Sequence, residues 1–341
     1  MANYTIYHPS WEHHAVLPRD HNSYCTEVLA YAIKEELTRQ GHSVYLNYIR
    51  LYTDDIYRHR LIIEELDIDS EIQASTLWMI ISNDDTKKFS IIDLQDSPAA
   101  TYQLKTHPNL VFSLVGQYSL ERYKFSNMFS PHQMMKLIPF VYTAYVPAAV
   151  ELLTEEIQDI RNSTSVLDDR VFFYGNNRDA YMHERQKIRE VITVLAEKYP
   201  DETCVGSWEA KLPREEFFRK AATHTINLGL PGHPWCSREH ELWTLGLPVM
   251  LYEHTHHVAV DLLPNYHYVA VPVGARLDIG MAKNPEVAAD SIMQYHREWI
   301  KPENRWKLNN IAKHGQTRML QRAQYSKLGP LAIELLQLGH W

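Results

Sequence analysis

The sequence predicts an α/β fold that is doubly wound and divided into two halves. Short apolar runs, suited to buried strands, alternate with longer stretches of helical periodicity, and this alternation occurs twice in the 341 residues. The polar stretch RNSTSVLDDR, residues 161–170, separates the two series. We therefore expect two domains, with residues 1–160 in the first and residues 161–341 in the second.

The first half opens as strand, loop, helix and strand. The helix is expected over residues 23–40, because Leu29, Ile33 and Leu37 share one apolar face and Gly41 marks its end. A second helix is expected from residue 146, running into the polar stretch. The predicted strands are residues 4–9, 42–49, 75–82, 89–96, 110–118 and 137–145.

The second half repeats the pattern with shorter strands. The predicted strands are residues 170–177, 202–208, 224–230, 249–252 and 266–274. The predicted helices are residues 184–200, 214–223, 238–245, 284–300 and 302–325. In an open α/β sheet, ligands bind beyond the carboxyl ends of the strands, so the loops after these strands should carry the functional residues.

One stretch, INLGLPGHPWCSREHELWTLGLPVMLYE, combines two apolar runs with a bend and a short helix. Gly232 lies in the bend, and Ser237 suits the N-cap of a helix that begins at Arg238. Gly246 stands where a glycine commonly ends a helix. A helix N-terminus attracts anions, and Ser237 and Arg238 reinforce that attraction here. The stretch therefore predicts an anion site.

Composition excludes several classes of protein. The net charge of -8 predicts no general attraction to nucleic acid. The N-terminal residues lack the basic and apolar regions of a signal peptide, and no apolar run is long enough to span a membrane, so we expect a cytoplasmic protein. The three cysteines, Cys25, Cys204 and Cys236, are far apart and fit a reducing compartment.

Four segments in the second half carry a family resemblance by their order. They are FFYGNN, SREHELWTLGLPVML, LLPNYHYVAV and IAKHGQTRMLQ, and together they span roughly residues 171–322. The ordered set resembles GT-B glycosyltransferases, most closely the CAP10-like group that includes protein O-glucosyltransferases. Exostosin-like enzymes are a second match. The first half is similar to these enzymes only in outline, as a Rossmann-like acceptor-side domain.

The resemblance implies transfer of a sugar from a nucleotide-diphosphate sugar to an acceptor hydroxyl on a glycan or glycoconjugate. It implies the GT-B architecture, in which two Rossmann-like domains face each other across a cleft and the second binds the donor. We expect an inverting, metal-independent reaction with the donor as co-substrate and no further cofactor. The last helix is expected to cross back to the first domain, with the crossing near Pro302.

Within that resemblance, the bend and the short helix supply the donor site. Ser237 and Arg238 are expected at the diphosphate, and Glu239 or, preferably, Glu241 at the ribose hydroxyls. The full set of expected donor-binding residues is Arg238, Ser237, Glu241, Glu239, Arg185, Arg178 and Gly232. Structural roles stay open: Ser237 also suits a simple cap, the glutamates suit the helix dipole, and Arg185 suits a solvated helix face.

An inverting transferase needs a general base near the acceptor hydroxyl, and the first domain should supply it. Loop residues His14, His21, Asp20, Asp93 and Asp96 are available, and we favour Asp20, Asp96 and His14. The segments EHH and HTHH invite a metal assignment. However, the fixed four-ligand spacing of a structural zinc site is absent, so we expect no metal.

Two other functions stay open on the same scaffold. A nucleotide-sugar 2-epimerase-like isomerase would need acid and base carboxylates beside the donor sugar, and no convincing pair stands out. A catalytically silent GT-B protein would bind glycan without turnover. Incubation with nucleotide sugars and no acceptor separates the three: an isomerase forms a new sugar, a transferase hydrolyses its donor slowly, and a binder does neither.

Overall fold

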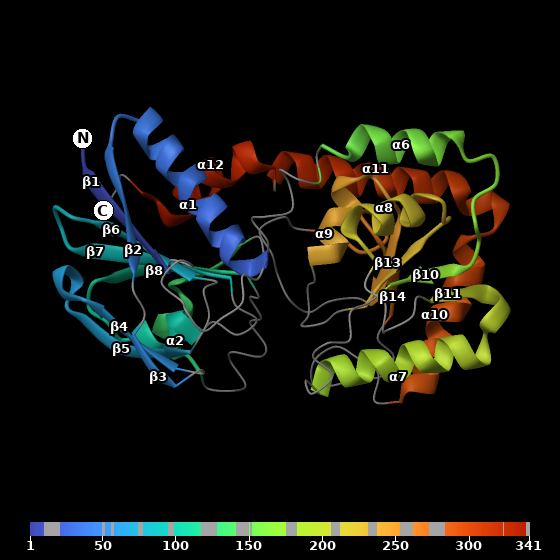
Figure 1. The fold of residues 1–341 in the computed structure, drawn as a ribbon, viewed down its shortest axis with the longest axis horizontal. Helices are drawn as coiled ribbons and strands as arrows, with labels where there is room; N and C mark the ends of the chain where they lie inside the picture. The colour runs from blue at the N-terminus through green and yellow to red at the C-terminus, as the bar shows by residue number, and fades with distance from the viewer. Residues whose placement is uncertain are drawn as a thin grey trace. The chain divides into compact units, whose positions relative to one another are not determined.

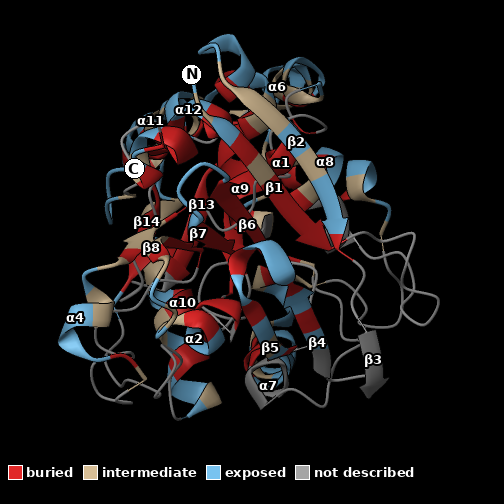
Figure 2. Ribbon diagram, turned by 90° about the vertical axis from the view of Figure 1, so that its left-hand side faces the viewer, coloured by how far each residue is buried: buried red, intermediate tan, exposed pale blue. Residues whose placement is uncertain are grey.

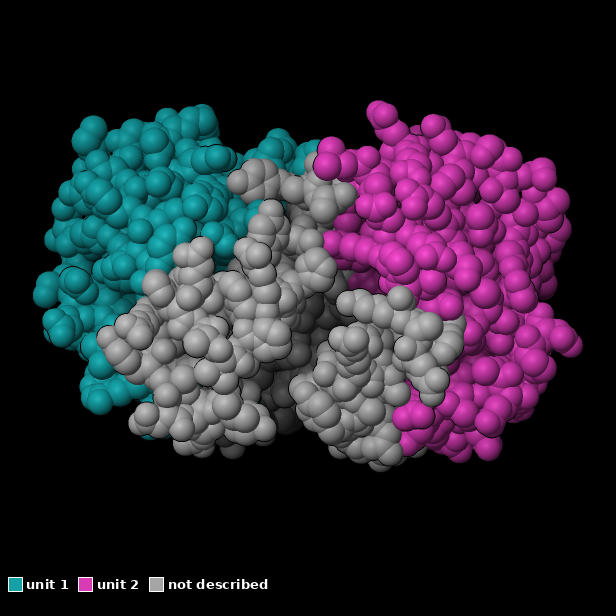
Figure 3. Space-filling model, in the orientation of Figure 1, with its two compact units in different colours: residues 1–145, 256–260, 322–341 teal, residues 146–255, 261–321 magenta. Residues whose placement is uncertain are grey.

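The computed structural model divides into two compact units, shown in separate colours in Figure 3. Unit 1 comprises Met1–Tyr145, His256–Val260 and Arg322–Trp341, and unit 2 comprises Val146–Thr255 and Asp261–Gln321. The structure describes residues 1–9, 21–49, 52–55, 58–73, 78–94, 99–116, 128–140, 150, 152–174, 183–205, 212–230, 237–252, 262–272, 284–322 and 324–338.

Unit 1 is built on a mixed sheet whose strands follow the order β2-β1-β6-β7-β8-β9 in the part of the chain that the structure describes. The strands are β1 (Asn3–Pro9), β2 (Ser43–Ile49), β6 (Trp78–Asn83), β7 (Lys88–Asp93), β8 (Leu110–Val115) and β9 (Leu137–Pro139). β1 pairs with β2, β7 with β8, and β8 with β9 in parallel. β6 runs antiparallel to both neighbours, β1 and β7, and a short turn joins it to β7.

A small antiparallel sheet, absent from the sequence-based prediction, covers part of unit 1. It consists of β3 (Tyr52–Asp55), β4 (Arg58–Ile63) and β5 (Ile68–Gln73), with the short helix η2 (Glu64–Leu66) between β4 and β5. Its buried residues Leu61 and Ile63 join Trp78 of β6 and Phe89 of β7 in one apolar cluster. Helix α2 (Ala99–Leu104) completes the same cluster, and Figure 2 shows β6 and β7 buried beside it.

The chain's C-terminal helix belongs to unit 1. Helix α12 (Tyr325–Leu336) lies along α1 (His21–Arg39), as the red and blue helices in Figure 1 show. A Cβ added at Gly329 would lie 2.3 Å from the Ala32 carbonyl oxygen, so the two helix backbones approach closely there. Short helix α4 (Pro131–Met134) is also in this unit and begins with a capping box at Ser130.

Gly329→Ala is expected to destabilise unit 1 by up to about 2 kcal/mol. Forcing a methyl group against a backbone atom costs about 1–3 kcal/mol, and the better helix propensity of alanine returns only about 1 kcal/mol. Urea unfolding measures the change, with Lys327→Ala as control because Lys327 is exposed on the same helix. Equal midpoints for Gly329→Ala and wild type would contradict the close packing of α12 on α1.

Unit 2 carries a sheet whose described strands are all parallel, in the order β11-β10-β12-β13-β14. The strands are β10 (Val171–Phe173), β11 (Thr203–Val205), β12 (Asn227–Gly229), β13 (Val249–Tyr252) and β14 (Val269–Val271). The helices are α6 (Thr154–Ser163), α7 (His183–Lys198), α8 (Arg214–Ala222), α9 (Ser237–Thr244), α10 (Pro285–Trp299) and α11 (Arg305–Arg322), with short helices η3 (Pro200–Glu202) and η4 (Pro302–Asn304).

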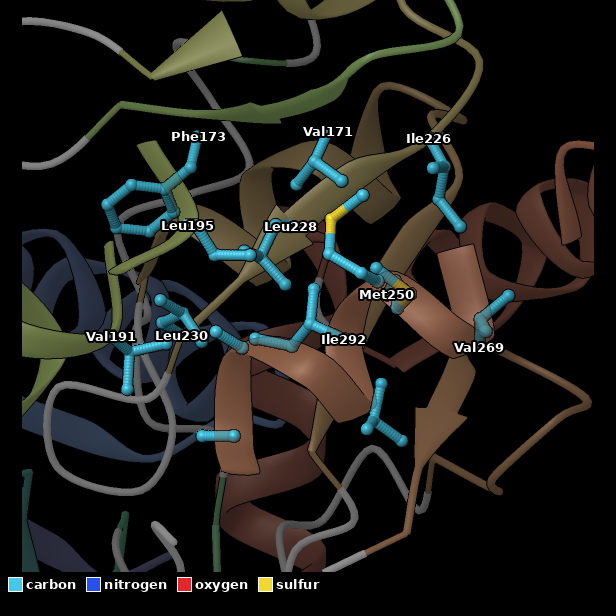
Figure 4. Packing of buried hydrophobic residues seen from close by; sticks show 14 of the residues in the cluster. Val171, Phe173, Val191, Leu195, Ile226, Leu228, Leu230, Met250, Val269 and Ile292 are labelled. Carbon is cyan, nitrogen blue, oxygen red and sulfur yellow. The ribbon is translucent and has the colours of Figure 1, made fainter. Parts of the chain in front are cut away.

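The unit 2 core lies against one face of this sheet. Strand residues Leu228 and Met250 lie beside Ile292 of α10, and Val191 of α7 joins the same cluster (Figure 4). Parallel strands covered on both faces read as continuous apolar runs, which is why the sequence pattern located them. Pro302 ends α10 as expected, but α11 stays in unit 2, and the chain returns to unit 1 one helix later, at Arg322.

Candidate functional site

The expected site residues differ in how far the structure describes them. Arg238, Glu239 and Glu241 are described with their side chains, all on α9. Ser237 is the first residue of α9 and Arg185 lies in α7, but their side chains are outside the description. The residues that lie wholly outside the described ranges are His14, Asp20, Asp96, Arg178 and Gly232.

The order of strands in unit 2 creates a switch point between β10 and β12. From β10 the chain proceeds outward to β11, and then returns past β10 to form β12, β13 and β14 on the other side. In doubly wound sheets of this order, ligands bind beyond the carboxyl ends of the strands where the direction reverses. The carboxyl edge at this point is formed by Phe173, the last residue of β10, and Gly229, the last residue of β12.

Arg238 reaches this carboxyl edge from the first turn of α9. Its guanidinium carbon lies 5.3 Å from the ring centroid of Phe173 and 5.7 Å from that of Phe217 on α8. These distances are typical of cation–π contacts, which fix the plane of the guanidinium without neutralising its charge. Among the described residues, Arg238 forms no ion pair with a carboxylate, and its influence on the Glu241 carboxyl is electrostatic.

Glu239 lies over the end of β12. A Cβ added at Gly229 would stand 2.8 Å from the Glu239 Cγ and 3.1 Å from its Oε1, so glycine is what lets the side chain settle there. Only 1% of Glu239 is exposed. The acidic residue in the first turn of α9 interacts favourably with the helix dipole, which supports the structural role left open above.

Glu241 is paired within the protein. Arg214, at the start of α8, donates from Nη2 to its Oε1. Burial raises the pKa of the Glu241 carboxyl, and the positive charges of Arg214 and Arg238 oppose that rise. The start of α9 is thus surrounded by two cations, Arg214 and Arg238, and two buried carboxylates, those of Glu239 and Glu241. The ion pair with Arg214 occupies Oε1 of Glu241.

Sequence reasoning did not select Arg214. It is 27 positions from Glu241 along the chain, so only the packing of α8 beside α9 reveals the pair. One local signal existed: a cation in the first turn of a helix is disfavoured by the helix dipole and calls for a compensating partner.

In unit 1, the structure assigns a role to Asp93, one of the carboxylates considered as a base. Asp93 ends β7 and is fully buried. Its Oδ2 accepts a hydrogen bond of 2.9 Å from the backbone N–H of Thr101 in the first turns of α2. Such an arrangement stabilises the start of α2. Asp96, the favoured neighbour, lies outside the described residues.

No cluster of three or more His, Cys, Asp or Glu side chains suited to a metal ion occurs within the described residues. None of the described helices combines the length and apolarity needed to cross a membrane.

No family model and no curated protein matches the chain. Among solved structures, a glycosyltransferase from Rickettsia africae ESF-5 is similar with 9% identity and a TM-score of 0.39, covering 67% of this chain and 64% of that one. The chain thus spans less than two thirds of that protein's length.

A Staphylococcus aureus TarM mutant, solved in complex with fondaparinux, α-GlcNAc-glycerol and UDP, is similar with 8% identity and a TM-score of 0.38. That comparison covers 98% of this chain and 100% of that one. Both TM-scores are too low to carry an argument about this chain's function.

Proposed function

We propose that the protein is a glycosyltransferase that binds a nucleotide-diphosphate sugar at the carboxyl edge of the unit 2 sheet. The observation that supports this most directly is the position of Arg238. Its guanidinium lies over the end of β10, at the switch point, in the first turn of a helix. A positive side chain and a helix N-terminus at that position suit a diphosphate, on which negative charge grows as the sugar leaves.

The finer parts of the proposal rest on the residues expected from the sequence. In this proposal the diphosphate site is completed by Ser237, Gly232, Arg178 and Arg185. The ribose hydroxyls donate hydrogen bonds to Glu239 or Glu241. The two units form a GT-B arrangement with the acceptor on the unit 1 side, where Asp20, Asp96 or His14 acts as base. Transfer inverts the sugar and needs no metal, because the cationic side chains take the role that a metal ion has elsewhere.

A ligand screen tests the proposal. Saturating UDP-, GDP- or dTDP-sugar should raise the melting temperature, because a ligand at 100 times its dissociation constant stabilises the folded state by about 2.7 kcal/mol. The matching nucleoside without phosphates is the control and should give no shift. Slow donor hydrolysis that survives EDTA should accompany binding. If no nucleotide sugar shifts the melting temperature, the proposal fails; if a new nucleotide sugar appears, the isomerase is correct instead.

A further inference from the structure

A groove with both polar and apolar lining lies on the face of the unit 1 sheet that carries η2. It has a volume of about 620 Å³ and is lined by β1, β2, η2 and the turn between β6 and β7. The lining residues that matter here are Tyr7, Tyr45, Asn47, Glu65, Asp84 and Lys87. A groove of this size accommodates a small ligand. None of its lining residues belongs to the proposed anion site at the carboxyl edge of unit 2.

An exposed aromatic side chain, that of Tyr45, is part of the lining of this groove. Tyr45 belongs to β2, which is the edge strand of the main sheet, and 64% of the residue is exposed. A strand holds its side chains in fixed directions, so the ring is presented without a large loss of freedom on binding. Large exposed tyrosines that retain a polar tip are suited to contact a ligand with both apolar and polar faces.

The groove also carries oriented polar groups. Asp84 accepts hydrogen bonds from the Thr5 hydroxyl at 2.9 Å and from the Ser82 hydroxyl at 2.8 Å, which fix its carboxylate. Burial and the charges of Glu65 and Asp84 raise the pKa of Tyr7 to about 12, so its hydroxyl stays protonated. Asn47 and Lys87 add N–H donors to the lining.

We propose that this groove binds a saccharide of one or two rings. Sugar hydroxyls both donate and accept, which matches a lining with carboxylate acceptors, amide and ammonium donors and a protonated phenol. The C–H face of a sugar ring suits the exposed face of Tyr45. A phosphate would meet two carboxylates, and a simple cation would leave the N–H donors of Asn47 and Lys87 without a role. The inference does not depend on the glycosyltransferase proposal, because the groove lies within unit 1.

The test is titration calorimetry of the full chain with three probes: maltose, chitobiose and the polyamine spermidine. At least one saccharide should bind, and Tyr45→Ala should weaken that binding by about three- to tenfold, the range for losing one aromatic contact. Glu65→Gln, at an exposed position, should weaken it further when combined with Tyr45→Ala. Tyr48→Ala is the matched control, since Tyr48 is on the same strand but outside the groove lining.

Three results would overturn the assignment. These are absence of binding for both saccharides, equal weakening by Tyr45→Ala and Tyr48→Ala, and binding of spermidine alone. Affinity for UDP, measured on the same variants, separates the two proposals. Tyr45→Ala should leave UDP affinity unchanged, and Arg238→Ala should leave saccharide affinity unchanged. Absence of UDP binding in the wild type would thus count against the glycosyltransferase and leave the saccharide groove in place.

Discussion

Arg238→Ala is expected to weaken the binding of a nucleotide diphosphate by about 10- to 150-fold. A hydrogen bond between charged partners contributes about 1.5–3 kcal/mol, and each 1.4 kcal/mol corresponds to a tenfold change in affinity. Arg238→Lys should fall between alanine and wild type, because it keeps the charge but loses the planar group that stacks over Phe173 and Phe217. Calorimetry with UDP, GDP and dTDP measures the effect.

The matched control for this prediction is Arg219→Ala. Arg219 is an exposed arginine of α8 that pairs with Glu156 and Glu215. Replacing it with alanine removes one positive charge from unit 2, as Arg238→Ala does. It should leave diphosphate affinity unchanged. Melting temperatures of both variants check folding. Equal affinity in Arg238→Ala and Arg219→Ala would remove the anion site from the start of α9.

Wild-type unit 2 is expected to lose about 2 kcal/mol of stability between pH 8 and pH 5 through one histidine. His296 of α10 is 1% exposed, and both ring nitrogens lack a hydrogen-bond partner among the described residues. Burial lowers the pKa of His296 to about 4, against its ordinary value of 6.5; Asp169 and Glu202 act in the opposite direction, and Arg297 adds to the lowering.

The sign follows from proton binding. Between pH 6.5 and pH 4 the unfolded chain takes up a proton that the folded protein does not, so the free energy of unfolding falls as the pH falls. The full loss approaches about 3 kcal/mol near pH 4, since one pKa unit corresponds to about 1.4 kcal/mol. Protonation of other groups adds to the loss, and the comparison with a variant isolates the His296 contribution.

His296→Leu should remove this part of the pH dependence and leave the protein as stable at pH 8, because leucine fills the site without buried polar atoms. Urea unfolding at pH 8 and pH 5, followed by tryptophan fluorescence, gives the difference. His132→Leu, at an exposed position of α4, should follow wild type at both pH values. Parallel curves for wild type and His296→Leu would show that His296 is not held neutral.

Much of the fold could be predicted because buried strands and amphipathic helices leave strong patterns. The strand expected over residues 110–118 is β8, and the helix expected over residues 238–245 is α9, one residue earlier. The small sheet β3-β4-β5 escaped prediction, since charged residues such as Arg60, Asp69 and Glu71 interrupt the apolar pattern of its strands. Helix α12 escaped because Gly329 and Pro330 read as helix breakers, whereas Pro330 lies inside the helix and Gly329 serves its contact with α1.

The sequence predicted only those site residues that lie close together along the chain. Arg238, Glu239 and Glu241 share a helix start, so their proximity follows from spacing. The ring of Phe173 under Arg238, the glycine under Glu239 and the ion pair of Glu241 with Arg214 come from other elements. Contacts of this kind depend on how the strands are ordered in the sheet, and a single sequence does not specify that order.

The packing of α12 on α1 has a consequence for the order of events during synthesis. Leu29, Ile33 and Leu37 are buried residues of α1 and emerge from the ribosome early, whereas α12, which packs on α1, emerges after all of unit 2. Until then the nascent chain carries an uncovered apolar helix face, which favours misassociation. Completion of unit 1 therefore waits for the synthesis of unit 2, because α1 can meet α12 only after the unit 2 residues between them have been made.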